Sequence, residues 1–259
     1  MIKDKDVLKS IYAHTKEICA NIQPPVSQKI TCDEETPQAG VDTELDWDRA
    51  GNIIVEPMDT VSALVKYSAL GKTAILNMAS AKRKGGGVEN GAMAQEECLF
   101  RCSNLYNIDD NFYPIKHDQY IYTHGASFVR DVNYGMMDTV VGDVITMPAI
   151  NLNTENNYSD YGYSNDQQGY EAMYLDKMYF MINAAALNGC TNIVLGAFGC
   201  GVFANNPKDI ANLFHETLFG SELYKQFDNV VFAIINDHNS VGDNYNTFKE
   251  QFEICNNIQ

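Results

Sequence analysis

Apolar residues recur along the chain with the spacings that distinguish helices from strands. Val7, Ile11 and Ile18 lie near helical spacing and predict an amphipathic helix over residues 4–21. Short apolar runs predict strands at 52–56, 73–78, 120–124, 143–147, 191–198 and 229–236. Helical periodicity is found at 60–69, 93–105, 171–187, 207–219 and 244–254. Because strands alternate with helices, the pattern predicts an α/β fold whose sheet is covered on both faces.

Two segments interrupt this periodicity. Residues 23–47 are rich in Pro, Thr and acidic residues and are expected to form an irregular connection. Residues 151–170 are rich in Asn, Tyr, Asp and Ser and are expected to form a long polar loop. We therefore expect an N-terminal helical extension and connection over residues 1–50, followed by one larger domain over residues 51–259. The extension could cap the sheet sandwich or serve as an arm that binds a partner.

The charge balance is strongly acidic and limits the classes of ligand. The 259 residues include 34 Asp and Glu against 18 Lys and Arg, a net charge of −16. An acidic surface repels polyanions, which argues against nonspecific nucleic-acid binding. A phosphate-rich ligand would have to be recognised locally, by backbone N–H groups and helix N-termini.

The cysteines, histidines and N-terminus indicate a cytoplasmic protein without a metal site. The seven cysteines form no CxxC pair, and the five histidines show no metal-ligand spacing. The N-terminus lacks the apolar core of a signal peptide, and no apolar run is long enough to span a membrane. We expect a soluble chain in a reducing compartment, with no membrane partner.

A first glycine-rich loop follows the predicted strand at 73–78. It carries the basic run Lys82–Lys84, then Gly85, Gly86 and Gly87, and it leads to Gln95–Glu97 at the start of a predicted helix. Three glycines allow close approach of a ligand and backbone with φ > 0. Carboxylates at a helix N-terminus are also favoured by the helix dipole, and Glu97 with Arg101 could form a surface ion pair. The residues alone leave the catalytic and structural interpretations of Glu97 open.

A second glycine-rich loop follows the predicted strand at 191–198. Gly196, Gly199 and Gly201 line a tight turn, after which Asn206 and Pro207 are suited to the N-cap and first position of a helix. Successive backbone N–H groups in such a turn form an anion-binding concavity. Neither loop has the GxGxxG spacing of a dinucleotide-binding fingerprint. Gly71-Lys72-Thr73 mimics the end of a phosphate-binding P-loop, but a strand follows it instead of a helix.

The two loops together resemble those of a known enzyme family. Gly85–Gly87, followed after seven residues by Gln95–Glu97, resembles the GGG…QEE signature of poly(ADP-ribose) glycohydrolases. The GCGVF core of the second loop and the DVITMPA run at 143–149 are similar to the microbial-type branch of that family. The resemblance covers roughly residues 52–238. One departure is Lys84, which stands where many relatives carry proline.

The resemblance implies a macrodomain, a three-layer α/β/α sandwich with a mixed central sheet. It implies that Glu97 is the catalytic acid and that Glu96 helps to hold the distal ribose. The first loop is expected to hold that ribose and the second to cradle the diphosphate. The expected ligand-binding residues are Ser80, Gly85, Gly86, Gly87, Val88, Gln95, Gly199, Cys200, Gly201, Val202 and Phe203. Adenine stacking is expected from Phe232 or from Ile235–Asn236.

The reaction implied is hydrolysis of a ribose–ribose O-glycosidic bond through an oxocarbenium-like transition state. Glu97 would have to carry a proton, which burial and the neighbouring Glu96 carboxylate would favour. The expected substrate is poly(ADP-ribose) or an ADP-ribosylated protein, the product is ADP-ribose, and no cofactor is implied. We find no counterpart of the tyrosine-bearing clasp of animal-type enzymes, so cleavage from the chain end (exo) is expected.

Three alternatives stay open. The first is a macrodomain that binds ADP-ribose without cleaving it, although such a module has no need of the Glu97 acid. The second is a hydrolase of mono-ADP-ribose linkages on protein or nucleic acid, which could use the same pocket. The third is an unrelated nucleotide-binding α/β protein. The Lys82–Lys84 run could likewise supply positive charge near phosphates or form a solvated loop.

Overall fold

A single mixed sheet organises the chain. The structure is a computed structural model that describes residues 2–32, 49, 51–236 and 240–256, so most of the predicted 23–47 connection and His238 lie outside the described residues. The strands are β1 Val26–Thr31, β2 Asn52–Glu56, β3 Thr73–Met78, β4 Gln119–Arg130, β5 Met136–Met147, β6 Asn192–Leu195 and β7 Asn229–Ala233. Their order is β1-β4-β5-β3-β6-β7-β2, in which β5, β3, β6, β7 and β2 are parallel and β1 and β4 pair antiparallel.

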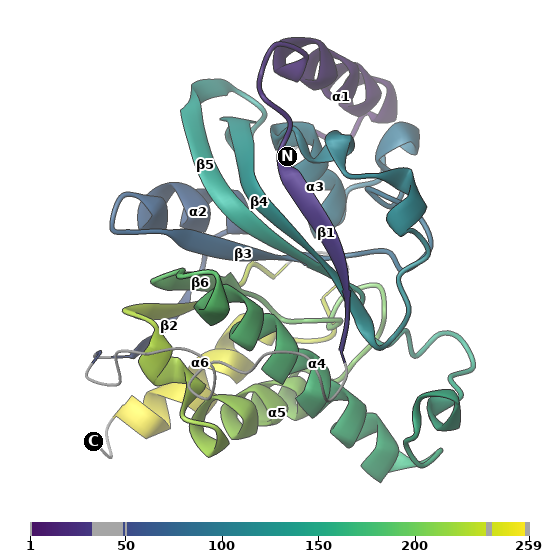
Figure 1. The fold of residues 1–259 in the computed structure, drawn as a ribbon, viewed down its shortest axis with the longest axis vertical. Coiled ribbons are helices and arrows are strands. Elements are labelled where there is room, and N and C mark those ends of the chain that lie inside the picture. The colour runs from purple at the N-terminus through teal and green to yellow at the C-terminus, as the bar shows by residue number, and fades with distance from the viewer. Residues whose placement is uncertain (1, 33–48, 50, 237–239, 257–259) are drawn as a thin grey trace.

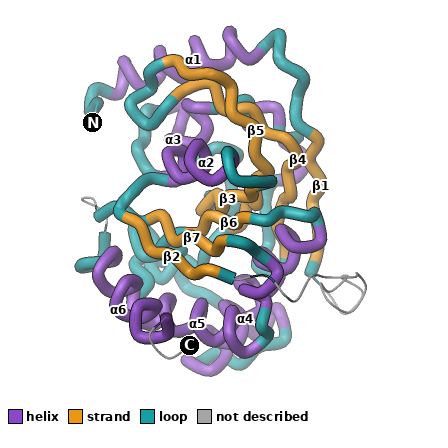
Figure 2. Tube along the Cα trace, turned by 90° about the vertical axis from the view of Figure 1, so that its left-hand side faces the viewer, coloured by secondary structure: helices purple, strands orange, loops and turns teal. Residues whose placement is uncertain are grey.

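Helices cover both faces of this sheet (Figure 1). They are α1 Lys5–Cys19, α2 Thr60–Ser68, α3 Gln95–Cys102, α4 Gln167–Leu187, α5 Pro207–Gly220 and α6 Asn244–Asn256. Helices α2 and α3 lie on one face, whereas α4, α5 and α6 lie on the other, as the edge-on view in Figure 2 also shows. The predicted three-layer α/β/α sandwich with a mixed sheet is therefore confirmed. No helix of the described residues is long and apolar enough to cross a bilayer.

The central strands are buried on both faces, which explains their continuous apolar runs. In β3, Ala74 and Leu76 face the core beneath α4, α5 and α6, whereas Ile75 faces the core beneath α2 and α3. Val230 and Val231 divide β7 in the same way. The period-two alternation thus assigns each strand residue to one of two cores.

Helix α1 forms an outer cover over α3. Asp4 caps its N-terminus, and the side chains of Leu8 and Tyr12 on its inner face are buried. The Thr15 hydroxyl donates to the carbonyl of Arg101 in α3 at 2.7 Å. Helix α1 therefore caps α3 and the 3-10 turn η1 (Val88–Asn90), whereas β1, which also lies in the extension, joins the sheet. The domain boundary near residue 50 stays a prediction.

The structure corrects the sequence prediction in two places. Val26–Thr31 lies in the predicted irregular connection but forms edge strand β1, paired antiparallel with β4. Its residues are half-exposed or exposed, so no apolar run marks it. Strands β4 and β5 are each 12 residues long and project as a hairpin well beyond the predicted 120–124 and 143–147 runs. The other predicted elements agree with the structure to within a few residues at their ends.

The carboxyl ends of the parallel strands gather the loops at one edge of the sheet. The first glycine loop follows β3, the polar 151–166 segment follows β5, and the second glycine loop follows β6. The N-terminus of α2 follows β2 at the same edge, and residues 234–236 leave β7 there. Open α/β sheets place their ligands at this edge.

Candidate active site

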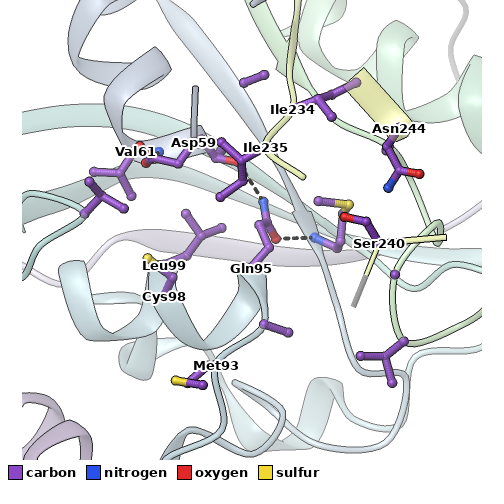
Figure 3. A pocket seen from close by; sticks show the side chains of 18 of the residues that line it. Asp59, Val61, Met93, Gln95, Cys98, Leu99, Ile234, Ile235, Ser240 and Asn244 are labelled. Atoms are coloured by element: carbon purple, nitrogen blue, oxygen red, sulfur yellow. Dashed lines mark hydrogen bonds between the residues drawn. The ribbon is translucent and has the colours of Figure 1, made fainter. Parts of the chain in front are cut away.

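A pocket of about 230 Å³ opens beside the second glycine loop, and Met78 and Met93, at the two ends of the first glycine loop, also line it (Figure 3). Five parts of the chain supply most of its lining: the N-terminus of α2, the N-terminus of α3, the β4–β5 turn, the second glycine loop, and described residues between the end of β7 and the start of α6. The lining residues are Asp59, Thr60, Val61, Met78, Met93, Ala94, Gln95, Cys98, Leu99, Val132, Tyr134, Ala149, Ala197, Gly199, Gly201, Val202, Phe203, Ala233, Ile234, Ile235, Ser240 and Asn244. Asp59 is the one residue with a charged side chain among these described lining residues.

Gln95 joins three elements at the floor of this pocket. Its Oε1 accepts a hydrogen bond from the Met78 N–H at the end of β3, at 2.9 Å. Its Nε2 donates to the Leu76 carbonyl at 2.6 Å and to Thr60 Oγ1 at the start of α2, at 3.1 Å. Figure 3 shows this side chain at the centre of the lining residues. Gln95 therefore fixes α3 against β3 and α2.

Glu96 is buried behind the first loop, with 3% of its surface exposed. Its Oε2 accepts a hydrogen bond from the Ser80 N–H at 2.7 Å, and the Asn77 amide lies 3.5 Å from Oε1. Burial raises the pKa of Glu96 to about 8, and the Glu97 charge adds to this, while the hydrogen bonds oppose it. Burial therefore favours the protonated form of Glu96.

Glu97 faces the glycine triplet and is almost as buried as Glu96. Its Oε1 accepts from the Gly87 N–H at 2.8 Å, and its Oε2 accepts from the Ala94 N–H at 2.9 Å. The second bond is the reciprocal half of a capping box, because Glu97 is the third residue of α3. The side chain thus joins the start of the helix to the loop.

The glycine triplet is required by this packing. Gly85 and Gly86 adopt φ of +68° and +58°, in the left-handed region that favours glycine. A Cβ on Gly85 would lie 2.7 Å from the Phe100 ring. A Cβ on Gly86 would lie 2.9 Å from Glu96 Oε2 and closer still to Glu97. The loop can therefore lie against both carboxylates only without side chains.

The second loop is held by a buried amide. Asn205 is fully buried, and its Nδ2 donates to the carbonyls of Ile150 at 2.8 Å and Gly199 at 3.0 Å. Its Oδ1 accepts from the Tyr170 hydroxyl at 2.9 Å. Gly199 adopts φ of +79°, and a Cβ there would lie 2.5 Å from Asn205 Nδ2. These bonds fix the loop before any ligand arrives.

The tip of this loop presents free donors. Among the described residues, the N–H groups of Gly201, Val202 and Phe203 donate to no protein acceptor. Asn206 caps the following helix by accepting from the Lys208 N–H at 2.9 Å, with Pro207 at its first position, as the sequence predicted. Three successive free N–H groups beside a pocket can bind an anion.

The predicted ligand-binding residues fall into three groups. Gln95, Gly199, Gly201, Val202 and Phe203 line the pocket. Ser80, Gly85, Gly86, Gly87, Glu96 and Glu97 form a cluster that adjoins it through Gln95. The Val88 and Cys200 side chains are buried in the core, so only their backbone atoms could reach a ligand.

The structure corrects other predictions for this region in part. Phe232 is fully buried in the core and stacked on Phe252 at 4.6 Å, so it cannot stack on adenine, whereas Ile235 is exposed and lines the pocket. The Lys84 ammonium is held by the carbonyls of Tyr106 and Ile108 and by Asp110 at 2.8 Å, and it is neither solvated nor free for phosphates. Lys82 and Arg83 are exposed.

The predicted surface pair between Glu97 and Arg101 is also wrong. Arg101 is fully buried, and its guanidinium donates to the Ala92 carbonyl and to the Tyr134 hydroxyl. No ion pair of the described residues joins it to Glu97. Both side chains are buried and form hydrogen bonds inside the protein instead of pairing with each other at the surface.

Sequence analysis missed parts of the site. The N-terminus of α2 from Asp59 to Val61, the turn at Tyr134, and Ser240 and Asn244 all line the pocket. Tyr113 lies near Glu96, whose charge adds to burial in raising the pKa of Tyr113, and its hydroxyl is buried with no partner among the described residues. The Asp59–Thr60 helix start was readable as a capping pattern, but nothing local links the other segments to the glycine loops.

Comparison with known proteins agrees with this geometry. Residues 7–133 match a family model described as microbial-type PARG, catalytic domain, and this span includes the glycine triplet and Gln95–Glu97. No curated protein matches by sequence.

Solved structures of poly(ADP-ribose) glycohydrolases (PARG) have a similar fold. The structure from Thermomonospora curvata has a TM-score of 0.75 at 23% identity and covers 95% of this chain and 100% of that chain. The Thermomonospora enzyme bound to the inhibitor ADP-HPD gives 0.71 at 26% identity, with the same coverage. The Deinococcus radiodurans enzyme in complex with ADP-ribose gives 0.69 at 24% identity, covering 97% of this chain and 92% of that chain. The resemblance predicted from the sequence is therefore confirmed: residues 7–133 are similar to microbial-type PARG catalytic domains, and the chain shares the fold of solved PARG structures.

Proposed function

We propose that this protein hydrolyses the ribose–ribose O-glycosidic bonds of poly(ADP-ribose) and releases ADP-ribose. The observation that carries the proposal is the contact between the glycine triplet and the paired carboxylates of Glu96 and Glu97, next to a pocket with free N–H donors. A pair of carboxyl groups at the reacting sugar is what glycoside hydrolysis requires. The structures of family members with ADP-ribose and with ADP-HPD support the same ligand class.

The pocket suggests how ADP-ribose is held. The diphosphate lies at the N–H groups of Gly201, Val202 and Phe203, because no Lys, Arg or His is found among the described lining residues. The distal ribose lies against Gly85–Gly87, where the backbone can approach it closely. The adenine lies in the apolar part of the pocket, near Val61 and Ile235. Backbone recognition suits a protein of net charge −16.

Glu97 and Glu96 have different roles in the proposed reaction. Glu97 donates a proton to the leaving ribose oxygen as the oxocarbenium-like transition state forms, and it then assists the attacking water. Glu96, with its pKa of about 8, enters the reaction protonated and can donate a hydrogen bond to a ribose hydroxyl. Gly87 N–H and Ala94 N–H orient Glu97 for this step. A positioned general acid contributes roughly 10²–10⁴ in rate.

Release of free ADP-ribose from purified poly(ADP-ribose) tests the proposal, with wild type compared with Glu97→Gln and Glu97→Ala. We expect release by wild type and none by either variant, while calorimetry shows that Glu97→Gln still binds ADP-ribose. The length distribution of the remaining polymer distinguishes exo from endo cleavage, and we expect exo.

Two results would contradict the proposal. Full turnover by Glu97→Gln would refute the assignment of the acid. Binding of ADP-ribose with no release from polymer by wild type would indicate a binding module or a hydrolase of mono-ADP-ribose linkages. Assays on mono-ADP-ribosylated protein and nucleic acid would then separate those two functions.

A further inference from the structure

The direction of the three free N–H groups in the second glycine loop depends on the carbonyls of the same peptide units. These N–H groups belong to Gly201, Val202 and Phe203, and the peptide bonds of this loop are trans. In a trans peptide the N–H and the preceding C=O point in opposite directions. A partner that holds the carbonyl of Cys200, Gly201 or Val202 therefore also aims the N–H that follows.

Two of these carbonyls are held by the backbone itself. The Cys200 carbonyl accepts a hydrogen bond from the Val241 N–H at 3.0 Å. The Gly201 carbonyl accepts from the Ala204 N–H at 2.9 Å, and this bond closes a turn over residues 201–204. The N–H groups that follow these two carbonyls are thereby fixed.

The central peptide of this turn has no backbone partner of this kind. It consists of the Val202 carbonyl and the Phe203 N–H, and neither residue has a positive φ, as in a type I turn. Type I and type II turns differ chiefly in the direction of this central peptide, and both can be closed by the same hydrogen bond. The closing bond therefore does not by itself fix the direction of the Phe203 N–H.

The polar segment that follows β5 supplies the missing partner. Asn153 Nδ2 donates to the Val202 carbonyl at 2.6 Å. The Leu152 N–H donates to the Phe203 carbonyl at 3.0 Å, so the segment holds two successive carbonyls of the turn. Asn153 is not among the described residues that line the pocket. It can therefore act on a ligand only through the peptide that it holds.

Hydrogen bonds within the segment present Asn153 to the loop. Its N–H donates to Asn151 Oδ1 at 3.0 Å. Asn156 Nδ2 donates to the carbonyls of Asn151 at 3.0 Å and Thr154 at 2.9 Å. Asn153 is exposed, but these bonds hold the backbone on both sides of it. Its amide is thus in place before any ligand is present.

We propose that Asn153 is a positioning residue that aims the Phe203 N–H at the diphosphate of the ligand, which makes residues 151–156 part of the binding site. This role rests on the proposed function, which places the diphosphate at this loop. While the Val202 carbonyl is held, the Phe203 N–H can donate to a phosphate oxygen. If the peptide turned over, the carbonyl oxygen would face the phosphate instead and repel it. Because the diphosphate is bound alike in the ground state and the transition state, Asn153 contributes to binding and not to the chemical step.

Asn153→Leu tests this role, because leucine has nearly the same shape but no donor. Asn157→Leu is a matched control, since Asn157 is also exposed and its side chain bonds Ser159, Asp160 and Asn165 of the same segment. In calorimetry we expect Asn153→Leu to weaken ADP-ribose binding about tenfold and the control to leave it unchanged. Adenosine, which lacks the diphosphate, should bind both variants as it binds wild type in NMR titrations. Equal losses in the two variants, or equal losses for ADP-ribose and adenosine, would overturn the role.

Turnover of poly(ADP-ribose) gives a second readout. The KM of Asn153→Leu should rise about tenfold while its kcat stays at the wild-type value, as expected when uniform binding is lost. A fall in kcat with an unchanged KM would show that Asn153 does not act through the binding of the diphosphate.

The free protein separates failure of this role from failure of the proposed function. If the peptide turns over in Asn153→Leu, the Phe203 amide proton moves next to Val202 Hα, so the NOE between these two protons should be stronger than in wild type. An unchanged NOE would overturn the role of Asn153 whether or not any ligand binds. If wild type binds no ADP-ribose but the NOE changes as expected, the proposed function fails, and Asn153 still sets the direction of the peptide.

Discussion

Gly86 lies so close to Glu97 that a Cβ at position 86 would come within 2.5 Å of Glu97 Oε1. The glycine therefore does more than permit a turn, because it sets the distance between the loop backbone and the carboxylate. Any side chain there must displace either the loop or Glu97.

Gly86→Ala should abolish hydrolysis for this reason. The substitution places a methyl group against Glu97 and also strains a backbone with φ of +58°. Gly189→Ala is a matched control, since its φ is +69° but its Cβ would meet nothing within 4 Å. Each variant should lose about 1 kcal/mol of unfolding free energy from backbone strain. We expect ADP-ribose release to be lost only in Gly86→Ala, and comparable activity in the two variants would contradict this account.

Glu96 should make stability fall as pH rises. Its pKa is raised to about 8 in the folded protein, against an ordinary value of 4.5, so between these values the folded state binds more protons than the unfolded state. The free energy of unfolding therefore decreases from about pH 4.5 to pH 8. Each unit of pKa shift corresponds to about 1.4 kcal/mol.

Glu96→Gln should remove this contribution. Urea denaturation at about pH 5 and pH 8 gives the free energies of both proteins, and the loss on going to pH 8 should be smaller in the variant. An unchanged difference would show that another group titrates in this window.

Asn205 and Asn206 are neighbours with different tasks. Asn205→Ala removes the side-chain bonds that hold the second loop and leaves the Ile150 carbonyl without this donor, which costs about 1–3 kcal/mol, and it should weaken ADP-ribose binding. Asn206→Ala removes a helix N-cap and costs roughly 0.5–2 kcal/mol. Calorimetry should show a loss of affinity for Asn205→Ala but near wild-type affinity for Asn206→Ala. Equal losses would mean that helix α5 and not the loop governs binding.

Affinity for ADP-ribose should not fall with salt. No basic side chain is found among the described lining residues, and the net charge of −16 repels the diphosphate until ions screen it. The dissociation constant measured by calorimetry should stay constant or decrease between about 50 and 500 mM NaCl. A steep increase would indicate a cation contact, for which exposed Lys82 and Arg83 are the candidates.

Much of the fold was predictable because the buried faces of helices and strands require apolar residues at regular spacings in the sequence. The strands at Asn52–Glu56 and Thr73–Met78 agree with prediction at both ends, since each lies in the parallel part of the sheet. Strand β1 was not predictable, because its polar residues lie at the sheet edge. The outer part of β5, from Met136 to Val141, was missed for the same reason, because most of its residues are exposed.

The site was predictable only where it is local in sequence. The glycine triplet, Gln95–Glu97 and the second loop are short motifs, and the structure brings them to one edge. The contributions of Tyr134, Ile235 and Asn244 depend on how distant segments fold together, so no spacing reveals them. The error at Phe232 has a related cause, since an aromatic residue in a strand can face either layer.

The attachment of α1 has a bearing on how the protein can be shortened. The Thr15 hydroxyl bonds the last turn of α3, Arg130 Nε donates to the same Thr15 at 2.9 Å, and Lys16 pairs with Glu89 at 3.1 Å behind the first glycine loop. A fragment that starts at residue 51 would leave the outer side of α3 bare to water. The helix that presents Gln95–Glu97 would then be anchored on one flank only. Helix α1 therefore supports the outer side of α3, and the first twenty residues are part of the unit that positions Gln95–Glu97.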